Sequence, residues 1–556
     1  MPRFLRCFPS RVKTRRVGVL PLSSEGGVVM GIGIIRKGNA RPLLAAICAA
    51  ALLAGLAGVA APAASALAPA APALAPVAEP FEPTLSYYKC PPKSLPAGVQ
   101  CAKLTVPLDW QNPGDGRTTT IDVRVMRSKE GKGGLTFNPG GPGGSGIDSF
   151  PTFYSILPDE VVSQFDFVAW DPRGVGRSGP KLTGCQYPSE VPSNPQPVGP
   201  VDWQEFWQGA ADELAALNTA CLAANPDSAP YLGTWQVIRD LDALRAALGY
   251  STWNYWGMSY GTRIGHAYAR TFPSKLRAMV MDGSVMANES TYRNGTSFPA
   301  NYWVSLQLFP ALAAPAAARK ITVIEKYLDD TVLVLPDDTE FTRWDWAGQF
   351  KMLLTGQSQY PTAVAFVNNL YAGITATSPA ERAKGLEVVA AISEVLRKTI
   401  EAQMLELAAV LVFVNCSDMH DRPTPSQLAA ASESIERNYG STQPIFMGNS
   451  SACFGLNPDD LSPAIPSGSS MIALKTPPVF VLSSGDAATP WVWGRSLANT
   501  FAGSRTITYN STQHVAYMLT PSTCVNAPVT EYLLILKPPS KNRLCTYAPG
   551  GAVPLR

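Results

Sequence analysis

Short hydrophobic runs separated by polar, turn-forming residues dominate the chain and predict buried β-strands. Eight such runs occur: KLTVPLDW (103–110), TTTIDVRVMRS (118–128), GLTFNPG (134–140), FDFVAWD (165–171), TWNYWGMS (252–259), LRAMVMDG (276–283), PVFVLSSG (478–485) and SRTITYN (504–510). Several are almost continuously apolar, as strands covered on both faces must be. Helical patterns at 202–224 and 234–249 lie between them. This alternation predicts an α/β fold with a mostly parallel, eight-stranded sheet and crossover helices.

The alternation stops between residues 284 and 477, where long Ala-rich helical patterns replace the strands. We interpret this stretch as a helical cap inserted into the α/β core. The core is therefore expected in two parts, residues 87–283 and 478–556.

The N-terminal region has the order of a secretory signal peptide. Basic residues precede the apolar run LLAAICAAALLAGLAGVAA, and small A-x-A sequences follow it, so residues 1–68 are expected to be an export signal. Met30 opens a leader of ordinary length, which makes 1–29 compatible with a start site placed too far upstream. A membrane anchor is the alternative, but a Pro/Ala linker (69–86) follows in place of a stop-transfer charge cluster. We expect a secreted protein.

Composition and charge narrow the functional classes. The 556 residues are 46% hydrophobic and 16% charged, which is typical of a core-forming globular protein. Beyond residue 68 the chain has 36 basic and 41 acidic residues, a balance of about −5. This balance argues against nucleic acid as a partner. Nothing in the sequence indicates an oligomer, and we expect a monomer.

Eight cysteines follow the leader, an even number that suits an exported protein. Counting alone leaves about 105 pairings open. Sequential pairing closes four local loops and is our prediction: Cys90–Cys101, Cys185–Cys221, Cys416–Cys453 and Cys524–Cys545. A zinc site is the alternative, but the chain has no CxxC and only three histidines, so no metal is expected.

The sequence GMSYG, residues 257–261, carries the strongest chemical signal. It is a G-x-S-x-G motif that follows an apolar strand and precedes a helix-compatible stretch, the context of a nucleophile elbow. The turn is too sharp for side chains at Gly257 and Gly261, and it exposes the hydroxyl of Ser259 at the carboxyl end of the sheet. A plain Gly/Ser strand-to-helix turn is the alternative interpretation.

A serine hydroxyl needs a base to take its proton, and only His266, His420 and His514 are available. His266 lies two turns along the helix that begins after Ser259, so it points away from the elbow. His420 falls in the cap. His514 follows the last predicted strand, where a loop would reach Ser259, and is our predicted base.

The third catalytic member should be a carboxylate that orients the imidazole. Asp486 directly follows the strand at 478–485, and the order Ser259, Asp486, His514 is that of an α/β hydrolase. Asp282, at the end of another strand, is the rival candidate.

An oxyanion needs backbone N–H donors placed where negative charge develops. The stretch NPGGPGGSG (138–146) follows a strand, and its glycines allow close approach of the main chain. We assign the donors to the N–H groups of Gly141 and Tyr260. A phosphate-binding loop is the competing interpretation, but no GK[ST] follows.

These motifs resemble a known family. FNPGGPGGSG, AWDPRGVGRS, GMSYGTRIGHAYA, SSGDAATP and the His514 loop together resemble secreted tripeptidyl aminopeptidases, in the proline-iminopeptidase-like branch of the α/β hydrolases. The resemblance extends from about Cys90 to Cys545. It implies an α/β-hydrolase fold with a cap between the sixth and seventh strands, and an exported serine exopeptidase acting on free N-termini. Ser259, Asp486 and His514 match the family's triad, and Gly141 falls in its oxyanion loop.

The chain departs from the family pattern at two places. The acid segment reads GDAATP, where the family has approximately GDxDPxTP, and Gln513 replaces the usual glycine before His514. Both changes are expected to affect loop packing and substrate fit. In DPRGVGRS, Asp171 and Arg173 are expected to form a charge-assisted brace near the site.

An exopeptidase must also hold the substrate's ammonium group, normally with a carboxylate. Glu289, after the sixth strand, and Asp418, in the cap, are the candidates, although each alone is more simply a solvated acid. The leading prediction is a cofactor-free serine exopeptidase that releases short peptides, tripeptides in particular, through an acyl-enzyme. A secreted carboxylesterase or lipase with the same triad and a non-catalytic hydrolase-fold binding protein are the alternatives.

Overall fold

A large β-sheet lies at the centre of the protein. The computed structural model describes residues 81–91, 95–185, 187, 198–466, 468 and 470–549, except for the side chains of 402–407. The strand order of the sheet is β1-β2-β3-β5-β4-β6-β7-β10-β11-β12. The strands are β1 (Thr84–Tyr88), β2 (Gln100–Pro107), β3 (Thr118–Met126), β4 (Gly134–Asn138), β5 (Asp166–Trp170), β6 (Trp253–Met258), β7 (Leu276–Asp282), β10 (Val479–Ser483), β11 (Arg505–Tyr509) and β12 (Arg543–Cys545). From β5 to β12 all pairings are parallel, and β1, β2 and β3 are antiparallel. This is the arrangement of an α/β hydrolase.

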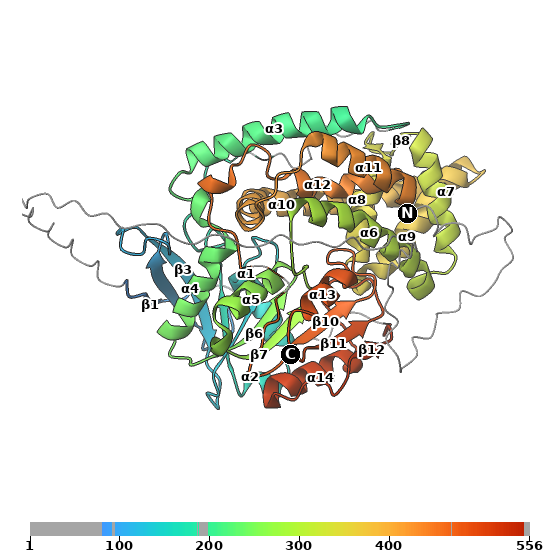
Figure 1. Ribbon diagram of the computed structural model, residues 1–556. Coiled ribbons are helices and arrows are strands. Elements are labelled where there is room, and N and C mark those ends of the chain that lie inside the picture. The colour runs from blue at the N-terminus through green and yellow to red at the C-terminus, as the bar shows by residue number, and fades with distance from the viewer. Residues whose placement is uncertain are drawn as a thin grey trace, which may run out of the picture. The chain divides into compact units, whose positions relative to one another are not determined.

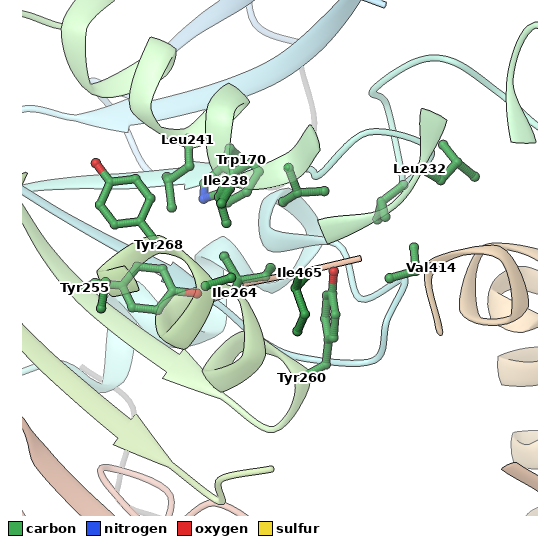
Figure 2. Packing of buried hydrophobic residues seen from close by; sticks show 14 of the residues in the cluster. Trp170, Leu232, Ile238, Leu241, Tyr255, Tyr260, Ile264, Tyr268, Val414 and Ile465 are labelled. Carbon is green, nitrogen blue, oxygen red and sulfur yellow. The ribbon is translucent and has the colours of Figure 1, made fainter. Parts of the chain in front are cut away.

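Helices cover both faces of this sheet, which is why its central strands are apolar on both sides. They are α1 (Gly146–Ile156), α2 (Asp159–Val162), α4 (Thr234–Ala247), α5 (Tyr260–Thr271), α13 (Trp491–Ala498) and α14 (Thr523–Ile535). Figure 2 shows one packed face, where Ile238 and Leu241 of α4 meet Ile264 and Tyr268 of α5. On the other face, side chains of α1 and α14 form a second buried cluster with the strands.

A helical layer is inserted between β7 and β10 and lies above the sheet in Figure 1. It contains α6 (Thr291–Ala313), α7 (Ala317–Asp330), α8 (Arg343–Leu354), α9 (Tyr360–Thr375), α10 (Pro379–Asp418), α11 (Pro425–Tyr439), α12 (Gly448–Ser451) and a small hairpin, β8 (Leu333–Val334) with β9 (Glu340–Phe341). The layer has a hydrophobic core of its own around Phe309, Trp346 and Phe366. Short 3₁₀ turns complete the chain: η1 (Ala229–Tyr231), η2 (Pro273–Lys275), η3 (Gln357–Gln359), η4 (Gln443–Met447) and η5 (Pro458–Asp460).

Two features differ from the sequence predictions. The prediction of eight strands was wrong, because the sheet of the described residues has ten, with the short strands β1 and β12 added at its edges. In addition, α3 (Trp203–Ala224), expected as a crossover helix of the core, packs on α11 across the top of the cap (Figure 1). The indole Nε1 of Trp207 donates to Ser432 Oγ at 2.8 Å, and the aromatic face of α3 is buried by α11 rather than by the sheet.

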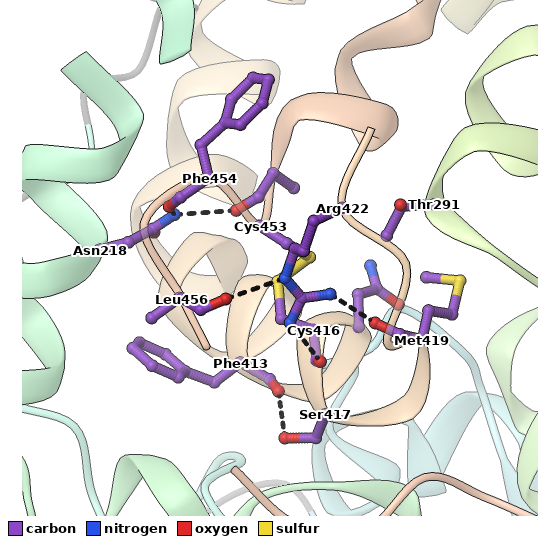
Figure 3. The surroundings of a disulfide bond; sticks show 12 residues. Asn218, Thr291, Phe413, Cys416, Ser417, Met419, Arg422, Cys453, Phe454 and Leu456 are labelled. Carbon is purple, nitrogen blue, oxygen red and sulfur yellow. Dashed lines mark hydrogen bonds between the residues drawn. A yellow bond between two sulfur atoms is a disulfide. The ribbon is translucent and has the colours of Figure 1, made fainter. Parts of the chain in front are cut away.

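Four disulfide bonds are formed: Cys90–Cys101, Cys185–Cys221, Cys416–Cys453 and Cys524–Cys545. These are the sequential pairs expected from the sequence. Figure 3 shows the third bond, beside which the guanidinium of Arg422 donates to the carbonyl oxygens of Cys416, Met419 and Leu456 at 2.7–3.1 Å. This cluster fixes the C-terminal end of α10.

The predicted signal peptide (1–68) and most of the predicted linker (69–86) lie outside the described residues. Across the part of the chain that is described, no helix combines the length and the apolar character needed to cross a membrane.

Candidate active site

Ser259 occupies a strained turn between β6 and α5. Its φ of 52° and ψ of −123° are unusual for a residue with a side chain. A Cβ at Gly261 would lie 2.6 Å from the carbonyl oxygen of Asn138, and one at Gly257 would lie 2.6 Å from the carbonyl oxygen of Gly261. Both positions therefore require glycine, as the motif predicts. The N–H of Ser259 donates to the carbonyl oxygen of Asp282 at 3.0 Å, which fixes the turn against the end of β7.

His514 and Asp486 lie side by side after β11 and β10. The imidazole Nδ1 is 3.0 Å and 2.9 Å from the two carboxylate oxygens of Asp486, which is fully buried. The backbone N–H groups of Ala488 and Thr489 also donate to that carboxylate, at 2.7 and 2.8 Å. This arrangement leaves the other ring nitrogen, Nε2, free to exchange a proton.

The end of β7 brings the imidazole and the serine turn to one place. A Cβ at Gly283 would lie 3.1 Å from His514 Cε1, so the imidazole rests directly on this residue. Ser259 is bonded to the neighbouring Asp282. The backbone of Ser259 and the imidazole of His514 therefore border two consecutive residues, Asp282 at the end of β7 and Gly283 after it. His514 keeps 20% of its side chain exposed.

The pKa of the His514 imidazole is shifted by the charges around it. Burial alone would lower its pKa, but the charge and hydrogen bond of Asp486, together with the charge of Asp282, raise the pKa above the ordinary 6.5. The positive charge of Lys351 opposes this rise.

Asp282, the rival acid, has a different set of contacts. Its oxygens accept from the N–H groups of Ala516 and Tyr517 at 3.0 and 2.8 Å. Complete burial raises its pKa to about 7. Asp282 thus anchors the loop that carries His514, whereas Asp486 contacts the imidazole itself.

The glycine loop after β4 lies against Ser259. A Cβ at Gly140 would be 2.8 Å from Ser259 Cβ, and Gly140 and Gly141 have φ values of 107° and 110° that favour glycine. Among the described residues, the N–H of Gly141 has no hydrogen-bond acceptor. The N–H of Tyr260 is at the first position of α5, where a helix leaves its donors free. Two N–H groups are therefore available beside the serine.

The expected brace between Asp171 and Arg173 was wrong, because each residue bonds elsewhere. Asp171 accepts from Ser145 Oγ at 2.6 Å and from the N–H of Ile147 at 3.1 Å, which fixes the end of the glycine loop where α1 begins. Arg173 is fully buried and forms a bidentate ion pair with Asp240, both bonds at 2.7 Å. Asp171 therefore supports the glycine loop, whereas Arg173 binds α4 through Asp240.

The two candidates for binding the substrate ammonium both contact one arginine. Arg263 donates two hydrogen bonds to Glu289, at 2.6 and 2.8 Å, and one to Asp418 at 3.1 Å. Asp418 also accepts from the N–H and Oγ1 of Thr234, at 2.8 and 2.6 Å. Arg263 is one helical turn beyond Ser259 on α5, so this cluster lies next to the serine turn.

The remaining histidines are separate from this constellation. His266 is buried in α5, and its Nε2 accepts from Arg270 Nε at 2.8 Å. Burial and the charge of Arg270 lower its pKa to about 3. His420 is exposed at the end of α10.

Cap residues that the sequence analysis did not single out support the loops of the acid and the base. The N–H of His514 donates to the carbonyl oxygen of Thr355 at 2.7 Å, just after α8. Ser305 Oγ on α6 donates to the carbonyl oxygen of Gly485 at 2.8 Å. Gln513, the departure from the family pattern, accepts from the N–H of Gln357 at 2.8 Å. No sequence signal could identify these contacts, because each joins segments more than 150 residues apart.

Comparison with known proteins gives two family matches. The family described as alpha/beta hydrolase fold matches residues 135–317, and the family described as TAP-like protein matches residues 445–545. The chain is 30% identical over 482 residues to the serine protease Hip1 of Mycobacterium tuberculosis, a match covering 82% of this chain and 89% of that protein.

Two further relatives differ in the chemistry that their names describe. The tripeptidyl aminopeptidase of Streptomyces coelicolor is 38% identical over 199 residues, or 34% of this chain and 36% of that protein. Carboxylesterase B of Mycobacterium tuberculosis is 27% identical over 477 residues, or 78% of this chain and 84% of that protein.

Proposed function

The chain belongs to the TAP-like family of α/β hydrolases, and we propose from this premise that it is an exported serine exopeptidase. It would release short peptides, tripeptides in particular, from the free N-termini of peptides. The observation that carries the proposal is the His514–Asp486 pair, which meets the strained Ser259 turn at the end of β7.

In the proposed reaction, Ser259 Oγ attacks the carbonyl carbon of the scissile bond while His514 Nε2 takes its proton. Asp486 holds the Nδ1–H and stabilises the imidazolium. The N–H groups of Gly141 and Tyr260 donate to the oxyanion of the tetrahedral intermediate. When the C–N bond breaks, the proton passes from His514 to the leaving amine, and water then releases the acyl group by the same steps.

The charge beside α5 supports a site for the substrate's ammonium. Glu289 and Asp418 together bring two carboxylates to the single guanidinium of Arg263, so the cluster is formally negative when all three are ionised. The oxygens of Asp418 are occupied by Thr234 and Arg263. We therefore assign the ammonium contact to Glu289, whose carboxylate accepts two bonds from Arg263 and one from Asn294 at 3.2 Å and still has a lone pair to offer.

The four disulfide bonds and the expected export signal also enter the proposal. Structural disulfides are typical of oxidising compartments, and the leader-like sequence at 1–68 would deliver the chain to one.

An esterase is the second candidate, favoured by the similarity to carboxylesterase B over most of the chain. The same triad would cleave an ester, whose leaving alcohol needs less assistance than an amine. The two candidates differ in their need for a free substrate amine.

The decisive experiment compares Ala-Pro-Ala anilides with free and acetylated N-termini, alongside a short-chain ester. Of the two anilides, we expect only the one with a free amine to be cleaved, and Ser259→Ala should abolish this cleavage. In Glu289→Gln the KM for that anilide should rise while ester turnover stays close to wild type. Ester turnover with no amide cleavage would contradict the peptidase proposal and support the esterase.

A further inference from the structure

Lys351 is a cation close to the proposed catalytic base, yet the mechanism above does not use it. It lies on α8, one turn before Thr355, whose carbonyl oxygen accepts from the N–H of His514 at 2.7 Å. Residues four apart on a helix share a face, so the Lys351 side chain projects from the part of α8 that covers the His514 loop. Its positive charge is one of the effects that lower the pKa of the imidazole, although burial and the charges of Asp486 and Asp282 have larger effects.

Aromatic rings, not carboxylates, surround this ammonium group. Lys351 Nζ lies 4.1 Å from the ring centroid of Phe298 on α6 and 5.1 Å from that of Phe446 on η4. Among the side chains that the structure describes, no carboxylate is within ion-pair distance of Lys351. Burial lowers its pKa to about 8, but the side chain remains partly exposed. Such a half-desolvated cation would gain from an anionic ligand.

The position of Lys351 defines which part of a substrate it would meet. The base must reach the leaving nitrogen, so the leaving group lies on the His514 side of the scissile carbon. Lys351 comes from the cap on that same side. The proposed ammonium site is the negatively charged cluster in which Glu289 and Asp418 bind Arg263, one turn along α5 from Ser259.

We propose that Lys351 is a specificity residue that binds the free C-terminal carboxylate of a short leaving peptide. This inference rests on the proposed exopeptidase function. A peptide would then be oriented at both ends, its ammonium near Glu289 and its carboxylate near Lys351. The preferred substrates are short oligopeptides with both termini free, in which the carboxylate can reach the cap.

The test compares two substrates that differ only at the C-terminus, Ala-Pro-Ala-Gly with a free carboxylate and the same peptide as its C-terminal amide. Release of Ala-Pro-Ala is followed by chromatography. The wild type should cleave the free acid with a kcat/KM ~10-fold higher than the amide, the size expected for one charge-assisted hydrogen bond. The preference should decline as the leaving peptide is lengthened, because the carboxylate then moves away from Lys351.

Variants separate binding from a structural role. Lys351→Met should remove the preference by slowing cleavage of the acid alone, and Lys351→Arg should keep it. Lys320→Met is the matched control, because Lys320 on α7 also lies over a ring, that of Tyr371 at 5.5 Å, and donates to Asn368. This control should keep the wild-type preference.

Equal cleavage of the two peptides by the wild type would overturn the inference, whatever the variants do. An unchanged preference in Lys351→Met would overturn it as well. Neither result would affect the exopeptidase proposal, provided that the free-amine anilide is still cleaved. If the wild type cleaves no peptide with a free amine, the proposed function fails and this inference fails with it.

Discussion

At the scale of single residues, the imidazole of His514 is influenced by charges from three elements. Burial lowers its pKa, Asp486 and Asp282 raise it, Lys351 lowers it, and the result lies above 6.5. A base works only when it is unprotonated, so activity is lost as pH falls through this raised pKa. We expect the acidic limb of the kcat/KM profile to have its midpoint above pH 6.5.

Removing the charge of Asp486 should change that limb in a defined direction. In Asp486→Asn the main group that raises the pKa of His514 is absent, so the midpoint should move to lower pH. The imidazole also exchanges its carboxylate partner at Nδ1 for a neutral amide that no longer fixes the tautomer, and kcat should fall by about 10⁴-fold. A pH–rate profile of the variant checks both effects, and a midpoint that stays in place would contradict the assignment of Asp486.

The glycine loop gives a second residue-scale prediction. In Gly140→Ala the new methyl group would meet Ser259 Cβ at 2.8 Å and the carbonyl oxygen of Met258 at 3.0 Å, at a φ of 107°. Moving the serine or the oxyanion donors by a fraction of an ångström should reduce kcat/KM by at least ~100-fold. Gly348→Ala on α8 is the control, because its Cβ would have no neighbour within 4 Å, and its activity should be unchanged.

The sequence could locate the proposed nucleophile, base and acid because each signal is local. Steric demands within five residues determine the glycines around Ser259, and scarcity leaves His514 as the histidine that follows a late strand. The position of Lys351 depends instead on how α8 packs over a loop that begins about 160 residues later. Nothing in the sequence near Lys351 carries that information.

At the scale of elements, the end of α10 joins the cap to the core through Asp418. This carboxylate caps the start of α4 at Thr234 and bonds Arg263 of α5. Asp418→Ala would leave the buried N–H of Thr234 without its acceptor and would remove one of the two carboxylates that bind the buried Arg263. We expect the free energy of unfolding to fall by about 3 kcal/mol.

Thermal unfolding measures this effect against Glu433→Ala. Glu433 lies on α11 and forms an exposed ion pair with Arg437, 3.6 Å long, of a kind that contributes little to stability. The midpoint should decrease markedly for Asp418→Ala and by less than one or two degrees for the control. Similar small decreases of the unfolding midpoint in both variants would show that the contacts of Asp418 between cap and core do not stabilise the protein.

The element predictions succeeded where apolar runs are long and failed at the edges of the sheet. β1 and β12 are short and half exposed, so their sequences lack the continuous apolar pattern of the central strands. The amphipathic pattern of α3 predicted a helix, but periodicity does not reveal which surface the apolar face will cover. Trp203 and Trp207 cover α11 in the cap rather than the sheet.

At the scale of the whole molecule, the cap completes the site as well as covering it. Ser305 of α6 binds the loop of Asp486, Thr355 after α8 binds the loop of His514, and Asp418 of α10 binds Arg263 of α5, the helix that begins after Ser259. Each member of the proposed triad therefore depends on the position of the cap, and a change that loosens the cap should reduce activity before it unfolds the core.

The Cys416–Cys453 disulfide offers a test of this dependence. It closes a loop of 37 residues and precedes Asp418 by two positions, whereas Cys90–Cys101 closes only 11 residues at the far edge of the sheet. Chain entropy gives contributions of about 4 and 3 kcal/mol for these loops, so replacing either pair by serine should lower stability by similar amounts.

Activity should respond differently. Loss of Cys416–Cys453 frees the end of α10, and kcat/KM measured well below the unfolding midpoint should decrease in that variant alone. If both double-serine variants kept the wild-type kcat/KM under those conditions, the alignment of the proposed catalytic groups would not depend on the position of the cap.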